Sequence, residues 1–379
     1  MKRLLALALA LALLLCACSP IGPRGRTLAL HEPAPSESPS AGQESSGGFL
    51  FKKRYAVALE KLNPEGQRPD TAEKRQIVGW LDDDSLLAVA YFTGESGGMT
   101  AELGKLSYQF GFYEGLLPLG DKAPEFVSLS RGREMLACQM EAEGVGKYLV
   151  IYSLGEKREI FSVSSFRVRS LPVWAADDHA LGVAAYASGK YTPSSIDIKS
   201  GAVGKVGPEQ SRALSILDFP AEGGLLLRRE AGEEGVYSLE FQKNGGEGSP
   251  LYSGYVGGAT ALSGDTALLL ARDSLRLLAP GADGVTAEST IESAVAAYAF
   301  SGDRHSIALA QRNRDGSIDI YAGLFSSGKV VNKVLVYKNI EGAGLGSVSR
   351  LLFSPDSKKL YVEGNSTAGL LQAVVLEFA

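Results

Sequence analysis

The fold of this chain is decided by the stretch Phe353-Ser354-Pro355-Asp356-Ser357-Lys358-Lys359-Leu360-Tyr361-Val362. Its skeleton is a large apolar anchor, Asp three residues later, Leu seven later and a second apolar residue nine later. The same skeleton begins at six earlier anchors, although two copies carry Gly132 or Glu222 in place of Asp. These anchors are Trp80, Leu129, Trp174, Phe219, Leu262 and Phe300, and successive anchors up to Phe353 are 49, 45, 45, 43, 38 and 53 residues apart. Seven copies at a nearly constant interval indicate a repeat architecture.

Each repeat contains the succession of elements that a small antiparallel sheet requires. An anchor ends one strand, a short turn with Asp or Gly reverses the chain, and an apolar run such as residues 87–91 forms the second strand. Third strands are predicted at residues 147–152, 195–198, 236–241 and 317–321, and a weaker fourth strand follows, as at 201–206. Four strands in about 40–45 residues are typical of a propeller blade. We therefore predict an all-β, seven-bladed β-propeller of four-stranded antiparallel blades, with eight blades as the alternative.

Two segments of the sequence also carry a family resemblance. Residues 353–362 and residues 312–330, RNRDGSIDIYAGLFSSGKV, resemble the PD40 (WD40-like) repeat of TolB-like β-propellers. In that family, an F-S-P-D-G-K-x-L-x-V run precedes a D-I-Y-V strand and a Gly-rich hairpin. The resemblance spans residues 77–379, but the earlier repeats have lost the Pro and often the Lys. It implies the propeller architecture and no particular activity, because this scaffold carries unrelated functions.

The last repeat lacks one strand. It supplies the two strands around Asp356 and a third at residues 370–378, whereas a strand-like run at residues 49–59 precedes the first anchor. We predict that residues 49–62 complete the last blade as its fourth strand, which would close the ring and leave no free sheet edge. The propeller domain would then span residues 49–379.

The N-terminal residues have the pattern of a bacterial lipoprotein signal peptide, predicted at residues 1–17. Lys2 and Arg3 precede a Leu/Ala run at residues 4–15, which at about 1.5 Å per residue is too short for a bilayer core of about 30 Å. Leu15-Cys16-Ala17-Cys18-Ser19 resembles the lipobox, which implies cleavage before Cys18 and a lipid on its thiol. Ordinary signal cleavage with a free thiol is the alternative. Residues 18–48 are rich in Pro, Ser and Gly, and this composition predicts a disordered, lipid-anchored tether.

The charge balance argues against nucleic-acid binding. The 379 residues carry 38 Lys and Arg against 43 Asp and Glu, a formal net charge of −5, and loss of Lys2 and Arg3 would make it −7. Nucleic-acid binding usually requires a basic surface. We also predict no metal and no cofactor, because Cys/His and His/Asp clusters with ligand spacing are lacking. His179 and His305 fall in strand-reversing turns and Cys138 in an apolar run, so no catalytic residue is assigned.

The remaining candidates for function are basic and aromatic side chains in loops. The loops that join second to third strands, and one blade to the next, gather around the mouth of a propeller's channel, and we place residues 93–103, 164–170, 187–195 and 311–316 in them. They contain the candidate binding residues Arg167, Arg169, Lys190, Tyr191, Arg312 and Arg314. Arg and Tyr often anchor interfaces, and basic groups on an acidic protein suit an acidic peptide or an anionic glycan. Simple solvated loops are the alternative.

Together these features predict a membrane-anchored, extracytoplasmic lipoprotein, on the outer side of the cytoplasmic membrane or in the periplasm. Its expected role is a non-catalytic protein–protein interaction platform for an envelope partner, because no catalytic constellation was found. Two alternatives remain open. One is a glycan- or small-ligand-binding module at the channel mouth, and the other is a metal-dependent propeller hydrolase or lactonase.

Overall fold

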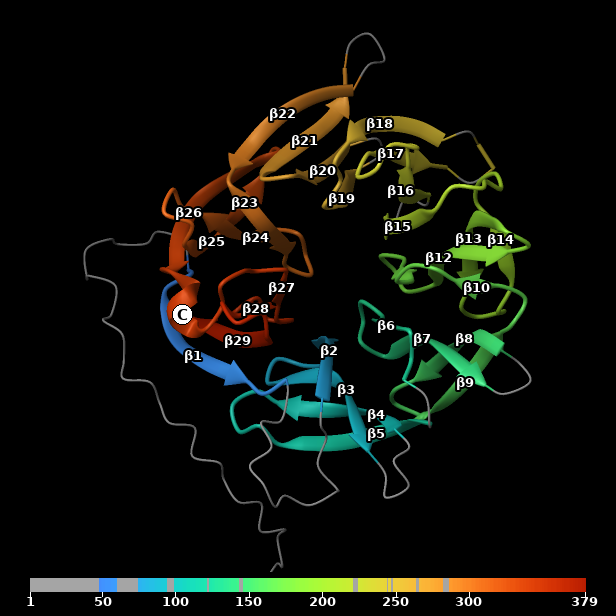
Figure 1. The fold of residues 1–379 in the computed structure, drawn as a ribbon, viewed down its shortest axis with the longest axis horizontal. Coiled ribbons are helices and arrows are strands. Elements are labelled where there is room, and N and C mark those ends of the chain that lie inside the picture. Colours follow the sequence, from blue (N-terminus) through green and yellow to red (C-terminus); the bar gives the residue numbers. More distant parts are fainter. Residues whose placement is uncertain are drawn as a thin grey trace, which may run out of the picture. The chain divides into compact units, whose positions relative to one another are not determined.

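A computed structural model of the chain describes residues 48–59, 74–93, 99–120, 123–142, 146–220, 224–243, 245–246, 248–263, 266–281 and 286–379. In these residues, seven antiparallel sheets follow one another around a common axis (Figure 1). This arrangement confirms the predicted all-β, seven-bladed propeller and excludes the eight-bladed alternative. The predicted signal peptide, Cys18 and the tether up to residue 47 lie outside the described residues, as do residues 60–62. Among the described residues, no helix is both long and apolar enough to span a bilayer.

Each blade starts with a strand near the axis and ends with a strand at the rim (Figure 1). Blade 1 contains β2 (Lys74–Trp80), β3 (Ser85–Thr93), β4 (Met99–Ser107) and β5 (Tyr113–Gly120), and blade 2 contains β6 (Phe126–Leu129), β7 (Met135–Ala142), β8 (Gly146–Ser153) and β9 (Arg158–Val163). Blade 3 contains β10 (Arg167–Val168) and β11 (Val173–Trp174), which together form its first strand, β12 (Ala180–Ala187), β13 (Lys190–Asp197) and β14 (Val203–Lys205); blade 4 contains β15 (Leu214–Asp218), β16 (Leu225–Glu230), β17 (Tyr237–Gln242) and β18 (Gly248–Gly254). Blade 5 contains β19 (Gly258–Ser263), β20 (Thr266–Ala271), β21 (Ser274–Pro280) and β22 (Thr286–Ser293); blade 6 contains β23 (Val295–Phe300), β24 (Ser306–Arg312), β25 (Ile318–Ser326) and β26 (Lys329–Tyr337); and blade 7 contains β27 (Arg350–Phe353), β28 (Lys359–Asn365), β29 (Leu371–Phe378) and β1 (Phe51–Val57). A short 3₁₀ helix, η1 (Ile340–Ala343), links the sixth blade to the seventh.

This strand order gives the ring two different faces. We call the face that carries the first-to-second and third-to-fourth strand turns the turn face. The opposite face carries the second-to-third strand turns and the connections between blades, and we call it the connection face. Because consecutive strands are antiparallel, every blade contributes the same kinds of turn to the same face.

The repeat skeleton corresponds to the turn between the first and second strands of a blade. Five of the seven anchors are the last residue of a first strand. Asp177, Asp303 and Asp356 each accept a hydrogen bond from the backbone N–H two residues later, at 3.0–3.1 Å. This is the turn chemistry that the sequence predicts for Asp. In the first blade, however, Asp82 takes this role, while Asp83 accepts a hydrogen bond from the N–H of Asp356 in the seventh blade.

The hydrophobic core is divided among the contacts between blades. The buried apolar residues form seven clusters in the described part of the chain, and each cluster joins two adjacent blades. The two tryptophan anchors reinforce this packing, because each donates its indole N–H to the preceding blade. Trp80 binds the carbonyl of Leu352 at 3.0 Å, and Trp174 binds that of Ser128 at 3.1 Å. The indole therefore fills the core and also satisfies a carbonyl of the neighbouring blade.

The ring is closed by β1, the first strand of the described residues. β1 pairs antiparallel with β29, from Phe51 opposite Phe378 to Val57 opposite Ala373, which is the position in which the sequence places a closing strand. β1 forms the outer strand of the last blade, whose other three strands come from the C-terminal end of the chain. The seventh blade also binds the first directly, because Arg350 donates to the carbonyls of Ile77 and Val78 at 2.7 and 2.6 Å.

Candidate interaction face

Four of the six predicted binding residues lie together at the connection face of blade 3. Arg167 is paired with Tyr186 across β10 and β12. The guanidinium of Arg169 lies 4.7 Å from the centroid of the Tyr186 ring, and the ring of Tyr191 lies 4.8 Å from the same ring. Lys190 follows the turn of the hairpin formed by β12 and β13. The cluster therefore rests on two tyrosine rings in contact, tilted by 55° to each other.

The loops predicted in blade 3 are shorter in the structure than the sequence suggests. Lys190 and Tyr191 belong to β13, and Arg167 belongs to β10. The predicted loop 187–195 reduces to a two-residue turn at Ser188 and Gly189, whose φ angles are 51° and 79°. Such left-handed pairs join strands in tight hairpins because their twist matches that of the sheet. Arg167, Lys190 and Tyr191 are therefore held on strands, whereas Arg169 lies just after β10.

Part of the positive charge of this cluster is neutralised. The ammonium of Lys190 lies 3.7 Å from the carboxylate of Glu209, which also binds Lys205 at 2.7 Å. The hydrogen bond from Lys205 and the charges of both lysines lower the pKa of Glu209. Arg167 is exposed and has no ion pair among the described residues. Blade 3 is therefore less basic than its sequence implies.

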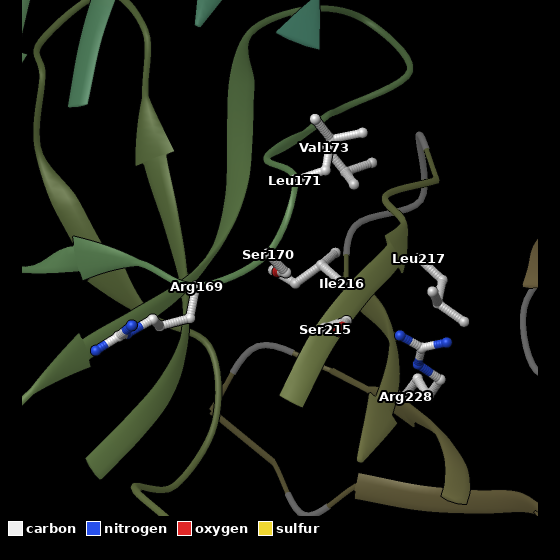
Figure 2. A pocket seen from close by; sticks show the side chains of 8 residues that line it. All are labelled: Arg169, Ser170, Leu171, Val173, Ser215, Ile216, Leu217 and Arg228. Carbon is white, nitrogen blue, oxygen red and sulfur yellow. The ribbon is translucent and has the colours of Figure 1, made fainter. Parts of the chain in front are cut away.

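A first cavity, of about 450 Å³, lies between the first strands of blades 3 and 4 (Figure 2). In this view, Arg169 points away from the other labelled side chains, and Arg228 lies beside Leu217. Arg228 donates to the carbonyl of Val256 at 3.2 Å and lies over the ring of Tyr237. The lining residues are Arg169, Ser170, Leu171, Val173, Ser215, Ile216, Leu217 and Arg228. The two arginines are thus engaged elsewhere, and apolar side chains dominate the cavity.

A second cavity, of about 360 Å³, lies on the connection face between blades 5 and 6, and we call it the arginine cavity. Three backbone segments build it: the turn between β20 and β21, the link from β22 to β23, and the turn after β24. The N–H of Val295 donates to the carbonyl of Asp273 at 2.9 Å, and that of Arg312 donates to Ala294 at 2.7 Å. The lining residues are Arg272, Asp273, Ala294, Val295, Ala296, Arg312, Asn313 and Arg314. Backbone hydrogen bonds therefore hold the three segments together.

The arginine cavity has an excess of positive charge. Three guanidinium groups and one carboxylate line it. Arg272 and Arg314 are exposed, and neither has a side-chain hydrogen bond or ion pair within the described chain. Arg312 makes only a long contact, 3.5 Å, to the carbonyl of Gly316. The cavity therefore offers hydrogen-bond donors to an anionic group.

Sequence reasoning identified Arg312 and Arg314 but missed Arg272. The third strand of the fifth repeat was not recognised, so the turn that precedes it was not placed on the connection face. The available signal was the polar pair Arg272-Asp273 between two Leu-rich runs, 268–270 and 275–278. Arg272 adopts a left-handed backbone with φ 52°, a conformation that is uncommon for residues with a side chain.

A second charged cluster, also missed from the sequence, lies on the turn face. The carboxylate of Asp218 is 7% exposed and pairs with Arg131 at 2.8 Å and with Arg304 at 2.9 Å. It also accepts hydrogen bonds from the backbone N–H groups of Phe219 and Ala261. The two arginines come from blades 2 and 6, whereas Asp218 ends the first strand of blade 4. This cluster therefore links three blades near the axis.

The other titratable candidates of the sequence lie apart from both cavities. His179 and His305 occupy first-to-second strand turns on the turn face and are exposed. Cys138 is fully buried on β7, and burial raises the pKa of its thiol. Among the described residues, no group of three or more His, Cys, Asp or Glu side chains could hold a metal ion.

Comparison with known proteins gives structural likeness only. No protein-family model and no curated protein sequence matches the chain. An oligogalacturonate lyase in complex with manganese aligns with a TM-score of 0.55 at 11% identity, over 87% of this chain and 98% of the lyase. The β-propeller domain of the Trilobed protease from Pyrococcus furiosus gives 0.53 at 11% identity, over 78% and 92% of the two chains. Prolyl oligopeptidase B from Galerina marginata gives 0.55 at 10% identity, over 76% of this chain and 47% of that one.

These likenesses concern the fold alone. The Pyrococcus domain is reported to have an open velcro topology, whereas here β1 and β29 pair and close the last blade. At identities of 10–11% the resemblance concerns the path of the backbone and carries no activity from one protein to another. The chain has a seven-bladed β-propeller fold of antiparallel blades.

Proposed function

We propose that this chain is a lipid-anchored, extracytoplasmic propeller that binds an acidic segment of an envelope protein without catalysing a reaction. The observation that carries the proposal is the arginine cavity. Two of its three guanidinium groups have no partner within the described chain, although the protein has a formal net charge of −5. Unpaired positive charges gathered on an acidic protein favour a partner of opposite charge.

The chemistry of arginine specifies the kind of group that is bound. A planar guanidinium forms two parallel hydrogen bonds with a carboxylate, which an ammonium does not do. The backbone hydrogen bonds between the three segments fix the positions from which these arginines project. Binding then costs less conformational entropy than it would on unconnected loops. Glu and Asp side chains of a partner protein are the ligands that this arrangement fits.

The proposed location depends on the N-terminal residues. Leu15-Cys16-Ala17-Cys18 resembles a lipobox, and a lipid on Cys18 would hold the propeller at the extracytoplasmic surface of the membrane. A rigid ring with the arginine cavity on its connection face and a membrane anchor suits a platform that binds a partner at the envelope.

Reversing the charge of the cavity is expected to remove the partner. In native membranes, the tagged chain is crosslinked and the captured proteins are identified by mass spectrometry. Arg272→Glu together with Arg314→Glu should lower the yield of the dominant partner by about tenfold or more, because unlike charges become like charges across the contact, at a cost of several kcal/mol. The control is Arg158→Glu with Lys199→Glu, which makes the same change of charge at exposed positions on the turn face. Equal capture by both double variants would contradict the proposal.

A second candidate function is the binding of an anionic glycan in the arginine cavity. Its volume of about 360 Å³ lies within the usual range of small-ligand sites, roughly 300–1,000 Å³. The structurally similar lyase acts on oligogalacturonate, according to its name.

Oligogalacturonate is therefore the probe for this candidate, used with and without manganese. A saturating concentration is expected to raise the melting temperature by about 3–5 °C, since ligand binding stabilises the native state, and Arg272→Glu with Arg314→Glu should abolish the rise. An unchanged melting temperature would favour the protein partner.

A further inference from the structure

The hairpin between β4 and β5 carries an exposed aromatic tip on the turn face. Phe110 and Phe112 are 70% and 68% exposed, the highest values among the large apolar side chains of the described residues. Their ring centroids are 6.2 Å apart. Large apolar side chains in such a position lose the benefit of burial unless they contact something outside the chain.

The tip is held in a defined conformation. The N–H of Ser107 donates to the carbonyl of Phe112 at 2.9 Å, and that of Gly111 donates to Ser107 at 2.8 Å. Gly111 has φ 69°, a left-handed conformation that glycine adopts at little cost. The two rings are therefore presented side by side on a closed turn, so little conformational entropy is lost when they make contact.

The chain enters the propeller on the same face. Phe51, at the start of β1, lies opposite Phe378, whose N–H donates to the carbonyl of Lys358 in the first turn of blade 7. β1 is also close to the aromatic hairpin, because the rings of Tyr55 and Tyr108 are 5.2 Å apart. Lys52 and Lys53 are exposed near this entry point. The turn face thus combines the entry of the N-terminal segment, two lysines and the aromatic tip.

We propose that Phe110 and Phe112 insert into the interface of the bilayer and orient the propeller with its turn face toward the membrane. The inference rests on the proposed lipid on Cys18. About 30 residues separate Cys18 from Gly48, and a flexible chain of that length has a mean reach of about 30 Å. Attachment at that distance makes contact with the bilayer intramolecular, at an effective concentration of about 1 mM. Contacts that are weak by themselves then become populated.

The chemistry of the tip suits a lipid surface. Aromatic side chains are favoured at the boundary between headgroups and acyl chains. Lys52 and Lys53, which are exposed near the entry of the chain on the same face, are attracted to anionic headgroups, by about 1 kcal/mol for each Lys near the surface. In this orientation the connection face, with its arginine cavity, points away from the bilayer and stays accessible to a partner.

A tryptophan at the tip tests this inference. The lipid-anchored Phe110→Trp variant is reconstituted in vesicles of phosphatidylethanolamine and phosphatidylglycerol. Its fluorescence is expected to shift to the blue and to be quenched by brominated acyl chains. The matched control is Tyr255→Trp, at an exposed position between β18 and β19 on the connection face, and it should stay unquenched. Trp80 and Trp174 are buried, and the unsubstituted chain provides their background signal.

The result distinguishes the tip from the anchor. Mass spectrometry of the same sample shows whether Cys18 carries a lipid. A lipidated Phe110→Trp variant whose fluorescence remains unquenched would overturn the insertion and leave the anchor intact, whereas a chain without lipid would overturn both. A benzophenone at position 110 that crosslinks one protein in native membranes, and no lipid, would overturn the insertion by showing that the tip binds a protein.

Discussion

Removing residues 49–59 from the chain is expected to abolish cooperative unfolding of the propeller. These residues contain β1, which supplies the outer strand of the seventh blade, and they contribute to two of the seven interblade clusters. Phe49 lies in the cluster between blades 6 and 7, and Val57 and Leu59 lie in that between blades 7 and 1. Their loss would expose the apolar edge of β29, and such edges pair with other chains. We expect an insoluble product, or one without a sharp calorimetric transition.

The control for this deletion removes residues 19–47 and keeps β1. Its melting temperature should equal that of the intact mature chain, because the sequence predicts no packed structure in the tether. Val57→Ala with Leu59→Ala provides a graded version of the same test. We expect it to lower the free energy of unfolding by about 2–5 kcal/mol while leaving the chain folded. A soluble product of the 49–59 deletion with an unchanged transition would show that β1 does not close the ring.

Replacement of Asp218 by Ala is expected to lower the free energy of unfolding by about 2–4 kcal/mol. Its buried carboxylate holds Arg131 and Arg304, which come from blades two positions away on either side. Loss of the carboxylate leaves both guanidinium groups without their counter-ion. The two arginines are 35% and 26% exposed, so water compensates part of this loss and keeps the cost below that of a fully buried pair. Urea denaturation followed by circular dichroism measures the change.

Two further variants separate the charge effect from simple loss of packing. Glu159→Ala removes an exposed carboxylate from β9 and should change stability little. Asp218→Leu combined with Arg131→Met and Arg304→Met removes every charge of the cluster at once. We expect this triple variant to be more stable than Asp218→Ala, because no guanidinium is left unpaired. If it is less stable, packing rather than charge explains the role of Asp218.

Most of the architecture was predictable because it depends on local chemistry that recurs along the chain. The carboxylate of a turn Asp accepts a hydrogen bond from the backbone N–H two residues later, and an anchor packs against apolar side chains. Both requirements therefore produce a repeated pattern in the sequence. The first repeat shows the limit of this reasoning. The spacing from Trp80 predicts Asp83 as the turn residue, but Asp82 accepts the hydrogen bond within the turn, while Asp83 accepts one from the N–H of Asp356. That bond joins residues far apart in sequence.

The candidate interaction face was predicted less completely. Arg312 ends a recognisable strand and Arg314 follows it, so their place on the connection face could be inferred. Whether a positive charge stays free depends on groups that are distant in the chain. Lys190 is partly neutralised by Glu209, and Arg228 is engaged by Val256 and Tyr237. A sequence shows that a residue is basic but does not show which carboxylate or carbonyl lies beside it.

The sequence by itself predicted seven blades, most of the strands within them and an N-terminal segment that completes the last one, but not the third strand of the fifth blade, β21. These features follow from apolar periodicity and turn chemistry, which act between neighbouring residues. Only the tertiary structure decided which charges meet. Asp218 reaches arginines 87 and 86 residues away, and Arg272 lies beside Arg312 and Arg314 because blades 5 and 6 are adjacent in the ring. Closing the ring creates these contacts, and no local pattern along the chain encodes them.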